Sequence, residues 1–326
     1  MVDRGRSIAM SENEAQTGVT MDAPFGKALV EVAGINGRVV GLTADLGKYT
    51  DMHPFRDAFP DRFFNVGMAE QNLIAVAAGL AKTDRIAFAT TYGVFATRRA
   101  YDFIAIACAH SRANVKIIAG LPGLTTGYGG THQAIEDLGL MIRVPGLIVI
   151  DPCDATEIMQ ATHAAAAHPG PVYMRLQRAA VPVVLDPARH RFKIGKAALL
   201  RDGTDVGIVS TGLMTARALA AADVLATQGI RASILHAATW KPFDTDAVIT
   251  LAGRVPALVT AENHVVRGGL ASLVAETLFD ASLSMSLQRV GLPDQFIECG
   301  SVPFLQAKYG LTTEHVVAAA KRALAR

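Results

Sequence analysis

Short runs of apolar, often β-branched residues alternate along the chain with longer stretches in which alanine and other apolar residues recur at helical spacing. The short runs have the length of buried strands, and they occupy residues 39–45, 86–92, 115–120, 147–152 and 172–176. Helical stretches lie between them, as in 73–81 and 155–167. This alternation is typical of a parallel sheet with helices on both faces. In such sheets ligands bind beyond the carboxyl ends of the strands.

The alternation stops over residues 179–205, where proline and basic residues interrupt short apolar runs, as is typical of a connection between domains. A second set of strand-like runs follows at 206–212, 232–237, 257–263 and 286–292. We therefore predict an α/β protein of two domains, each a mostly parallel sheet flanked by helices. The first domain is expected over 20–185, a linker over 186–200 and the second domain over 201–326, after a disordered leader over 1–19.

Composition narrows the class of protein. Hydrophobic residues make up 51% of the chain and charged residues 18%, which is enough apolar material for sizeable cores. The net charge of +2 and the lack of a dense Lys/Arg cluster predict no nucleic-acid partner and no membrane partner. No signal peptide or stretch of about 20 apolar residues is present, so a cytoplasmic protein is expected. The cysteines, Cys108, Cys153 and Cys299, lie far apart and include no CxxC pair. An odd number of separated cysteines does not form a disulfide framework, so we expect small buried thiols.

One acid stands at the start of a long apolar segment. Over residues 65–81, which read NVGMAEQNLIAVAAGLA, Glu70 is the only charged side chain, and the next charge is Lys82. A carboxylate in the first turn of a helix meets unpaired N–H groups and the positive end of the helix dipole. A structural role is therefore the ordinary interpretation of Glu70, and a functional role needs support from other motifs.

Three loop segments gather residues that suit a binding site. Asp45 follows a predicted strand in ADLGKYT, and Tyr92, Phe95 and Arg98 recur at a spacing of three in TTYGVFATRRAYD. His132 ends the glycine-rich segment GLPGLTTGYGGTHQ. Glycines allow a ligand to approach the backbone, but this segment has neither the Walker nor the GxGxxG spacing. Taken singly, His132 is best interpreted as a structural histidine and the two aromatic residues as core residues.

Taken in order, however, the motifs ADL, GMAEQN, YGVFATRRAYD, GGTHQ and RLQRAAVP resemble the pyrimidine-binding domain of transketolases and of deoxyxylulose-phosphate synthase. KPFD and ENHVVRGGL are similar to the C-terminal domain of the same enzymes. The resemblance covers residues 20–326 and implies thiamine-diphosphate-dependent transfer of a two-carbon ketol unit from a ketose phosphate to an aldose. Two alternatives remain at this point: the β subunit of a 2-oxo acid dehydrogenase, and a non-catalytic relative that acts as a structural subunit.

The resemblance also implies roles for the residues of the first three motifs. At the position of Glu70 these enzymes have a glutamate that faces the aminopyrimidine ring of thiamine diphosphate and activates the cofactor. Tyr92 and Phe95 match aromatic residues that pack on this ring, and Arg98 takes the third place, as in the synthase. Asp45 matches an acid near the cofactor and the subunit interface.

Two residues are expected to hold the substrate. His132 matches a histidine that hydrogen-bonds the reacting end of the donor, and Arg178 matches an arginine that holds the sugar phosphate. Three positions depart from the transketolase pattern: Gly120 replaces a phosphate-binding histidine, Tyr128 an acid that reads the donor hydroxyls, and Tyr49 a serine near the phosphate. Since polar readout carries strong selectivity, these departures indicate a non-standard donor, for which apulose 4-phosphate is an example.

One expected motif is missing. Transketolases bind the cofactor diphosphate through Mg²⁺ with a GDG motif that is followed by an asparagine, and the only Asp-Gly pair here, Asp202-Gly203, follows an arginine. No metal site is therefore predicted in this chain. We expect it to be the C-terminal subunit of a split transketolase whose partner carries the GDG motif and holds Mg²⁺, in an α2β2 assembly with the active site at the interface.

Overall fold

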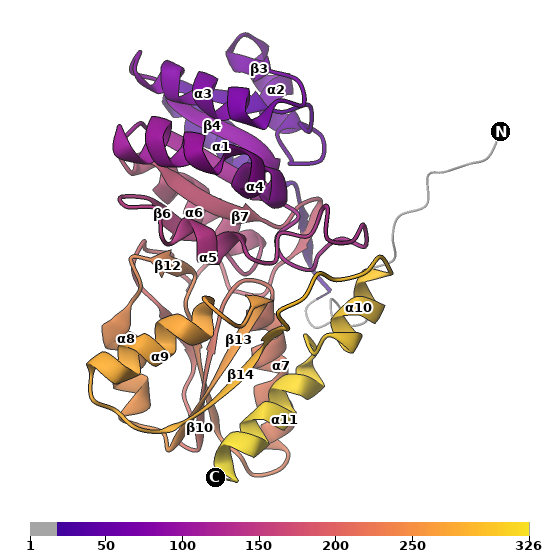
Figure 1. Cartoon of the computed structure of the whole chain (residues 1–326), viewed down its shortest axis with the longest axis vertical. Helices are drawn as coiled ribbons and strands as arrows, with labels where there is room; N and C mark the ends of the chain where they lie inside the picture. Colours follow the sequence, from indigo (N-terminus) through magenta and orange to yellow (C-terminus); the bar gives the residue numbers. More distant parts are fainter. Residues whose placement is uncertain (1–17, 326) are drawn as a thin grey trace, which may run out of the picture.

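The computed structural model describes residues 18–325, which form two α/β domains stacked along the long axis of the molecule (Figure 1). The leader predicted for residues 1–19 lies outside the described residues except for Gly18 and Val19. The two-domain α/β fold with mostly parallel sheets is as predicted. None of the helices within residues 18–325 is long and apolar enough to cross a membrane.

The first domain is built on a seven-stranded sheet with the order β12-β6-β7-β5-β4-β2-β3. Its strands are β2 (Val39–Thr43), β3 (Phe63–Asn65), β4 (Ile86–Tyr92), β5 (Val115–Gly120), β6 (Ile148–Ile150), β7 (Val172–Leu176) and β12 (Thr239–Lys241). All neighbours are parallel except β12, which runs antiparallel to β6. Every residue of β2, β4, β5 and β7 is buried, as is expected of strands that helices cover on both faces.

Helices cover both faces of this sheet. They are α1 (Pro24–Ile35), α2 (His53–Ala58), the 3₁₀ helix η2 (Pro60–Arg62), α3 (Glu70–Ala81), α4 (Gly93–Phe103), the π-helix η3 (Ile104–His110), α5 (Asp137–Met141) and α6 (Ala155–Ala167). The apolar sides of α3 and α4 pack into one buried cluster and those of α1 and α6 into another. A small antiparallel pair, β1 (Thr20–Asp22) with β8 (Ala180–Pro182), closes the domain.

The second domain has a five-stranded sheet with the order β14-β13-β10-β11-β9, parallel except for β9. Its strands are β9 (Ala198–Arg201), β10 (Val206–Ser210), β11 (Ala232–His236), β13 (Ala257–Val265) and β14 (Ser286–Leu292). The helices are α7 (Met214–Ala226), α8 (Thr245–Ala252), α9 (Leu270–Asp280), α10 (Val302–Lys308) and α11 (Thr313–Leu324). Helices α7 and α11 cover one face, and α8 and α9 cover the other.

The two domains share buried material. Strand β12 comes from the second half of the chain but extends the first sheet, which the sequence pattern did not predict. The apolar cluster beneath α3 and α4 also continues to Val209, Leu235 and Leu258 of the second sheet. The junction between the domains is therefore a continuous core, and loops that lie against it are fixed by both domains.

Candidate active site

The predicted site residues gather at one edge of the first sheet. Tyr92 and Gly120 end the neighbouring strands β4 and β5 and lie directly opposite each other. Asp45 follows β2, and Arg178 follows β7, the strand that pairs with β5. Because the carboxyl ends of parallel strands meet at one edge, residues that are 133 positions apart in sequence surround the same surface.

Glu70 is the first residue of α3, and only 3% of it is exposed. Its Oε1 accepts a hydrogen bond from Arg99 Nη1 at 3.0 Å. The guanidinium carbon of Arg99 lies 4.0 Å from the centroid of the Phe95 ring, so one arginine joins the carboxylate to the aromatic surface. Arg99 was not predicted from the sequence, because the spacing of three in its motif pointed to Arg98 instead.

Three of the predicted residues form an aromatic cluster. The ring of His132 lies 5.3 Å from that of Phe95 and 6.4 Å from that of Tyr92, centroid to centroid. Tyr128 packs edge-on against the same histidine at 5.5 Å, and Thr131 Oγ1 lies 2.9 Å from His132 Nδ1. His132 is half-buried. The structure thus joins a strand end, a helix and a loop around one partly open imidazole.

Arg98 takes a different direction from Arg99. It forms an ion pair with Glu136 and donates a hydrogen bond to the carbonyl of Gly130 at 2.6 Å. Its guanidinium carbon also lies 5.6 Å from the ring of Phe296 in the second domain. Arg98 therefore lies against the glycine-rich loop, and its contribution to a pyrimidine pocket stays a prediction.

Asp45 shapes the turn before Glu70. Asp45 Oδ1 accepts a hydrogen bond from Asn65 Nδ2 at 2.9 Å, and Asn65 Oδ1 accepts one from the backbone N–H of Asp45 at 3.0 Å. The same Asn65 oxygen accepts from Gly67 N at 3.1 Å. Asp45 itself is exposed with a φ of 58°. These contacts connect the end of β2 to the segment that leads into α3.

Arg178 lies half-buried beside Tyr49 and Asp51. Its guanidinium carbon is 5.8 Å from the centroid of the Tyr49 ring, and its buried Nε has no hydrogen-bond partner among the described residues. A buried N–H without a partner is costly and suits an anionic ligand. Burial raises the pKa of Asp51 to about 6, although the backbone N–H of Ala179 and the charge of Arg178 both favour its ionised form. Asp51 was not predicted from the sequence.

The described residues contain one cluster of possible metal ligands, Cys153, Glu157 and His236, buried where the domains meet. Glu157 already accepts hydrogen bonds from His236 Nε2 at 2.7 Å and from the backbone N–H of Cys153 at 2.9 Å. Thiol and imidazole are not the oxygen ligands that Mg²⁺ prefers. This cluster therefore does not fit the diphosphate-bound Mg²⁺ of the expected cofactor.

Matches to known proteins cover both domains of the chain. The family model of the transketolase pyrimidine-binding domain matches residues 17–183, and that of the transketolase C-terminal domain matches residues 195–316. A transketolase family protein of Sinorhizobium fredii is 52% identical over 93% of this chain and 88% of its own length. The 6-deoxy-6-sulfo-D-fructose transketolase subunit SqwH of a Clostridium species is 43% identical over 90% of each chain.

A solved structure is similar over nearly the whole chain. It is described as a split gene transketolase, an inactive β4 tetramer, and superposes with a TM-score of 0.87 at 44% identity. The match covers 94% of this chain and 99% of that chain. The similarity therefore includes both domains and their relative placement.

Proposed function

This chain belongs to the transketolase family as a C-terminal subunit of the split type, and from that premise we propose that Glu70, Phe95 and His132 form half of an active site that a partner chain completes. The family, the fold and the transferase class predicted from the sequence are confirmed by the family models and the similar proteins. Members of this family use thiamine diphosphate. The individual residue roles, the donor and the assembly are the proposed part.

The observation that carries the proposal is the grouping of a buried carboxylate with an aromatic surface and a partly open imidazole. Arg99 connects Glu70 to Phe95, and Phe95 contacts His132. A flat apolar surface beside a carboxylate fits the pyrimidine end of thiamine diphosphate. When bound, the cofactor supplies the nucleophilic carbon and the electron sink for breaking a carbon–carbon bond next to a carbonyl.

Each side chain then has a distinct task. Glu70 holds a proton at a ring nitrogen of the aminopyrimidine, Phe95 supports the face of the ring, and His132 hydrogen-bonds the hydroxyl or carbonyl oxygen at the reacting end of the donor. Arg178 binds the terminal anion of the donor through a guanidinium whose Nε has no partner among the described residues. Along the edge of the sheet, Arg178 follows β7, His132 follows β5, Phe95 follows β4 and Glu70 follows β3, so the proposed anion site and the proposed pyrimidine site lie at opposite ends of this row.

A partner chain is proposed because one half of the site is missing. Among the described residues, the one cluster of possible Asp, Glu, His or Cys ligands contains Cys153 and His236 and does not suit Mg²⁺. Met68, two residues before Glu70, is 80% exposed. The similar split transketolase is described as inactive in its β4 form. We propose that a GDG-bearing subunit supplies Mg²⁺ and the diphosphate site, covers the turn at Met68, and assembles with this chain as α2β2.

The donor is proposed to be a non-standard ketose with a terminal anion. A Cβ on Gly120 would lie 3.2 Å from Thr50 Cγ2 and 3.4 Å from the Tyr92 ring, so a larger residue would crowd this position. Tyr128 lies beside His132, and Tyr49 beside Arg178. Tyr128 and Tyr49 therefore each border one of the proposed substrate-binding residues, while Gly120 lies against Tyr92. The name of SqwH gives a sulfo-sugar as its substrate. The anion that Arg178 would hold is therefore either a phosphate or a sulfonate.

Calorimetry of thiamine diphosphate with Mg²⁺ tests the proposed assembly. The chain alone is expected to bind the cofactor weakly, and a mixture with a GDG-bearing subunit from the same organism is expected to bind tightly and gain ketol transfer. Tight binding or full turnover by the isolated chain would overturn the shared site. Tight binding by the mixture without turnover of any donor would instead favour a structural subunit.

A panel of donors then tests specificity. Xylulose 5-phosphate, fructose 6-phosphate, apulose 4-phosphate and 6-deoxy-6-sulfo-fructose are offered with an aldose phosphate acceptor. We expect one of the last two to be turned over with a kcat/KM at least about tenfold above the first two, because one changed polar contact is sufficient for such discrimination. Equal turnover of all four would contradict a specialised donor site. Release of products from pyruvate instead would favour the 2-oxo acid dehydrogenase alternative.

A further inference from the structure

The loop that carries His132 is held by the second domain, although that domain contributes no residue to the proposed catalytic cluster. The loop runs from Leu121 to Glu136 between β5 and α5. Two of its apolar side chains, Leu124 and Ile135, are at most 4% exposed and belong to the buried core of the second domain rather than the first. His132 lies between these two anchors, so its placement depends on how the domains meet.

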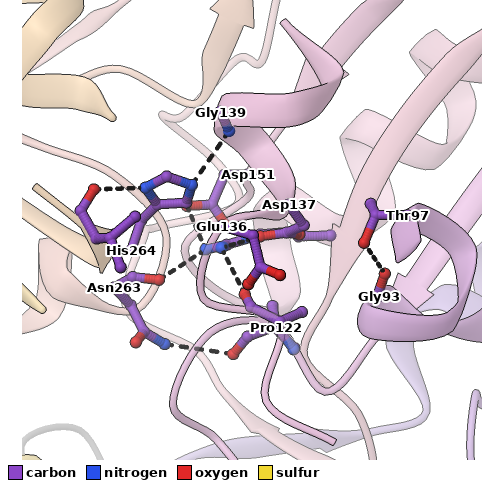
Figure 2. A network of polar contacts seen from close by, with 12 residues as sticks. Gly93, Thr97, Pro122, Glu136, Asp137, Gly139, Asp151, Asn263 and His264 are labelled. Atoms are coloured by element: carbon purple, nitrogen blue, oxygen red, sulfur yellow. Dashed lines mark hydrogen bonds and ion pairs between the residues drawn. The ribbon is translucent and has the colours of Figure 1, made fainter. Parts of the chain in front are cut away.

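One amide side chain fixes the first half of this loop. Asn263, near the end of β13, accepts a hydrogen bond at Oδ1 from Leu124 N at 2.8 Å. Its Nδ2 donates to the carbonyl of Pro122 at 3.3 Å (Figure 2). Asn263 is 2% exposed. A Cβ on Gly123 would lie 2.4 Å from the carbonyl oxygen of Asn263, so only glycine allows this approach, and its φ of 57° has the same requirement.

The other end of the loop is attached to the same residue through a buried arginine. Arg175 Nη1 donates to the carbonyl of Asn263 at 3.1 Å, and Nη2 donates to the carbonyl of Ala134 at 3.2 Å. Arg175 also forms an ion pair with Asp137, at the start of α5. Both ends of the loop therefore converge on Asn263, one directly and one through Arg175.

Further contacts with the second domain hold the middle of the loop. Gln306 Nε2 in α10 donates to the carbonyl of Leu124 at 2.9 Å. Gly300 N donates to the carbonyl of Gly127 at 3.1 Å, and a Cβ on Gly127 would lie 2.1 Å from the carbonyl oxygen of Gly300. Within this set Asn263 is the residue whose side chain contacts the loop at two points, through a donor and an acceptor.

We propose that Asn263 is a positioning residue: it sets the path of the loop and thereby holds His132 against Phe95 and in reach of the donor. The proposal rests on the role proposed above for His132. Its physical basis is that misplacing a reacting partner by about 1 Å costs about 10²-fold in rate. A loop rich in glycine does not hold such a position by itself, because glycine has the widest conformational freedom. Contacts from the second domain would then restrict the loop and fix the position of the His132 imidazole.

The first test follows the ring of His132 directly. The full chain is labelled with ring-¹³C histidine, and the His132 signal is assigned as the one that His132→Ala removes. Asn263→Ala is expected to shift or broaden this signal. Lys241→Met is the matched control, because Lys241 Nζ donates two hydrogen bonds across the same boundary, to the carbonyls of Ile142 and Val144, and none to the loop. An unchanged His132 signal in a folded Asn263→Ala chain would overturn the proposal.

Asn263→Asp keeps the proposal testable if the alanine variant does not fold. The aspartate retains an oxygen for Leu124 N and places a second oxygen, instead of a donor, opposite the carbonyl of Pro122. A shifted His132 signal is again expected, while His163, which is half-exposed on α6 and pairs with Glu31, keeps its wild-type signal. A His132 signal that stays unmoved in this variant would overturn the proposal equally.

The second test is a double-mutant cycle in the complex assembled with the GDG subunit, using the donor of the panel that is turned over fastest. Asn263→Ala is expected to lower kcat by about 10-fold or more, but by less than about twofold when His132 is already alanine, because both changes then remove one function. Independent, multiplicative losses would contradict the positioning role. If His132→Ala alone leaves kcat unchanged, the function proposed for His132 fails, while the ring signal still decides whether Asn263 positions it.

Discussion

Two regions of the molecule differ in how their charged side chains are paired. One is the junction between the domains, around Arg175 and Asp137, and the other is the outer face at the start of α3 and on α4, around Glu70 and Arg99. At the junction, Arg175 is 1% exposed and donates hydrogen bonds to Asp137 and two backbone carbonyls. On the outer face, Glu70 is buried, but its partner Arg99 is half exposed and the nearby Met68 is 80% exposed. The buried guanidinium at the junction is therefore fully paired within the chain, whereas the ion pair on the outer face is half open to solvent. We expect substitutions that remove a buried charge partner at the junction to change mainly the stability of the chain, and those on the outer face to change assembly and turnover.

The largest expected effect is that of Glu70→Gln on turnover. Glutamine has the same shape and still accepts a hydrogen bond from Arg99, so the free energy of unfolding is expected to change little. It has no proton to share with the cofactor, and the kcat of the assembled enzyme should fall by about 10²–10⁴-fold. Glu276→Gln, on the exposed side of α9, is the control and should keep wild-type turnover. Wild-type turnover in Glu70→Gln would refute the assignment.

The next largest effect is expected at the junction, from Asp137→Asn. Burial opposes ionisation of Asp137, but the Arg175 guanidinium outweighs it and holds the pKa of Asp137 below its usual value. Removing the carboxylate leaves the buried guanidinium without its main partner, which should lower the free energy of unfolding by about 3–5 kcal/mol. Urea denaturation of the chain measures this.

The matched change on the outer face sharpens the comparison. Arg99→Met breaks a pair that is half open to water, and such pairs contribute about 1 kcal/mol or less. If Asp137→Asn lowers the free energy of unfolding by no more than Arg99→Met does, the junction is not a rigid support.

The sequence predicted the framework better than the contacts. Nine apolar runs became strands β2, β4, β5, β6, β7, β10, β11, β13 and β14, because a strand buried on both faces has a visible local pattern. Glu70, Phe95 and His132 became candidates because motifs in a fixed order made the resemblance recognisable; their roles stay predictions. Strand β12 was missed, because a three-residue strand that joins the sheet of another domain has no local signature.

The partners of the site residues were not predictable in the same way. Arg99 contacts Glu70 across 29 positions, and Asn263 contacts Leu124 across 139. Neither pair leaves a periodic pattern, because each depends on how complete elements pack. Asp51 likewise owes its raised pKa to burial, and burial of a single carboxylate in a loop is a property of the folded chain. The sequence therefore predicted candidate catalytic residues, but it did not predict the residues that contact them.

A third prediction concerns how stability depends on pH. It involves Asp51, a buried carboxylate that has no ion pair as strong as the one between Asp137 and Arg175. Asp51 is 2% exposed, and burial raises its pKa from 3.8 to about 6. The folded chain thus keeps this proton where the unfolded chain has released it. The resulting stabilisation is full below about pH 3.8 and is lost as the pH rises through about 6.

Asp51→Asn should remove this dependence, since an amide oxygen still accepts from Ala179 N. Relative to wild type, its free energy of unfolding should rise by about 3 kcal/mol between pH 4 and pH 7, which is the equivalent of about two pKa units. Asp61→Asn, at an exposed aspartate, is the control and should show no such rise. A flat difference for Asp51→Asn would mean that its carboxylate is compensated as fully as that of Asp137.

The smallest expected effect separates the two adjacent arginines of α4. Arg99→Met keeps an apolar contact with the Phe95 ring and removes a half-exposed ion pair, so kcat should fall by about fivefold or less. Arg98→Met removes contacts with Glu136 and Gly130 in the loop that carries His132, and should raise the KM of the donor. Steady-state kinetics of both variants in the assembled enzyme distinguish these effects. A loss in Arg99→Met as large as that in Glu70→Gln would show that Glu70 and Arg99 act as one unit, and that this part of the outer face is as tightly coupled as the junction.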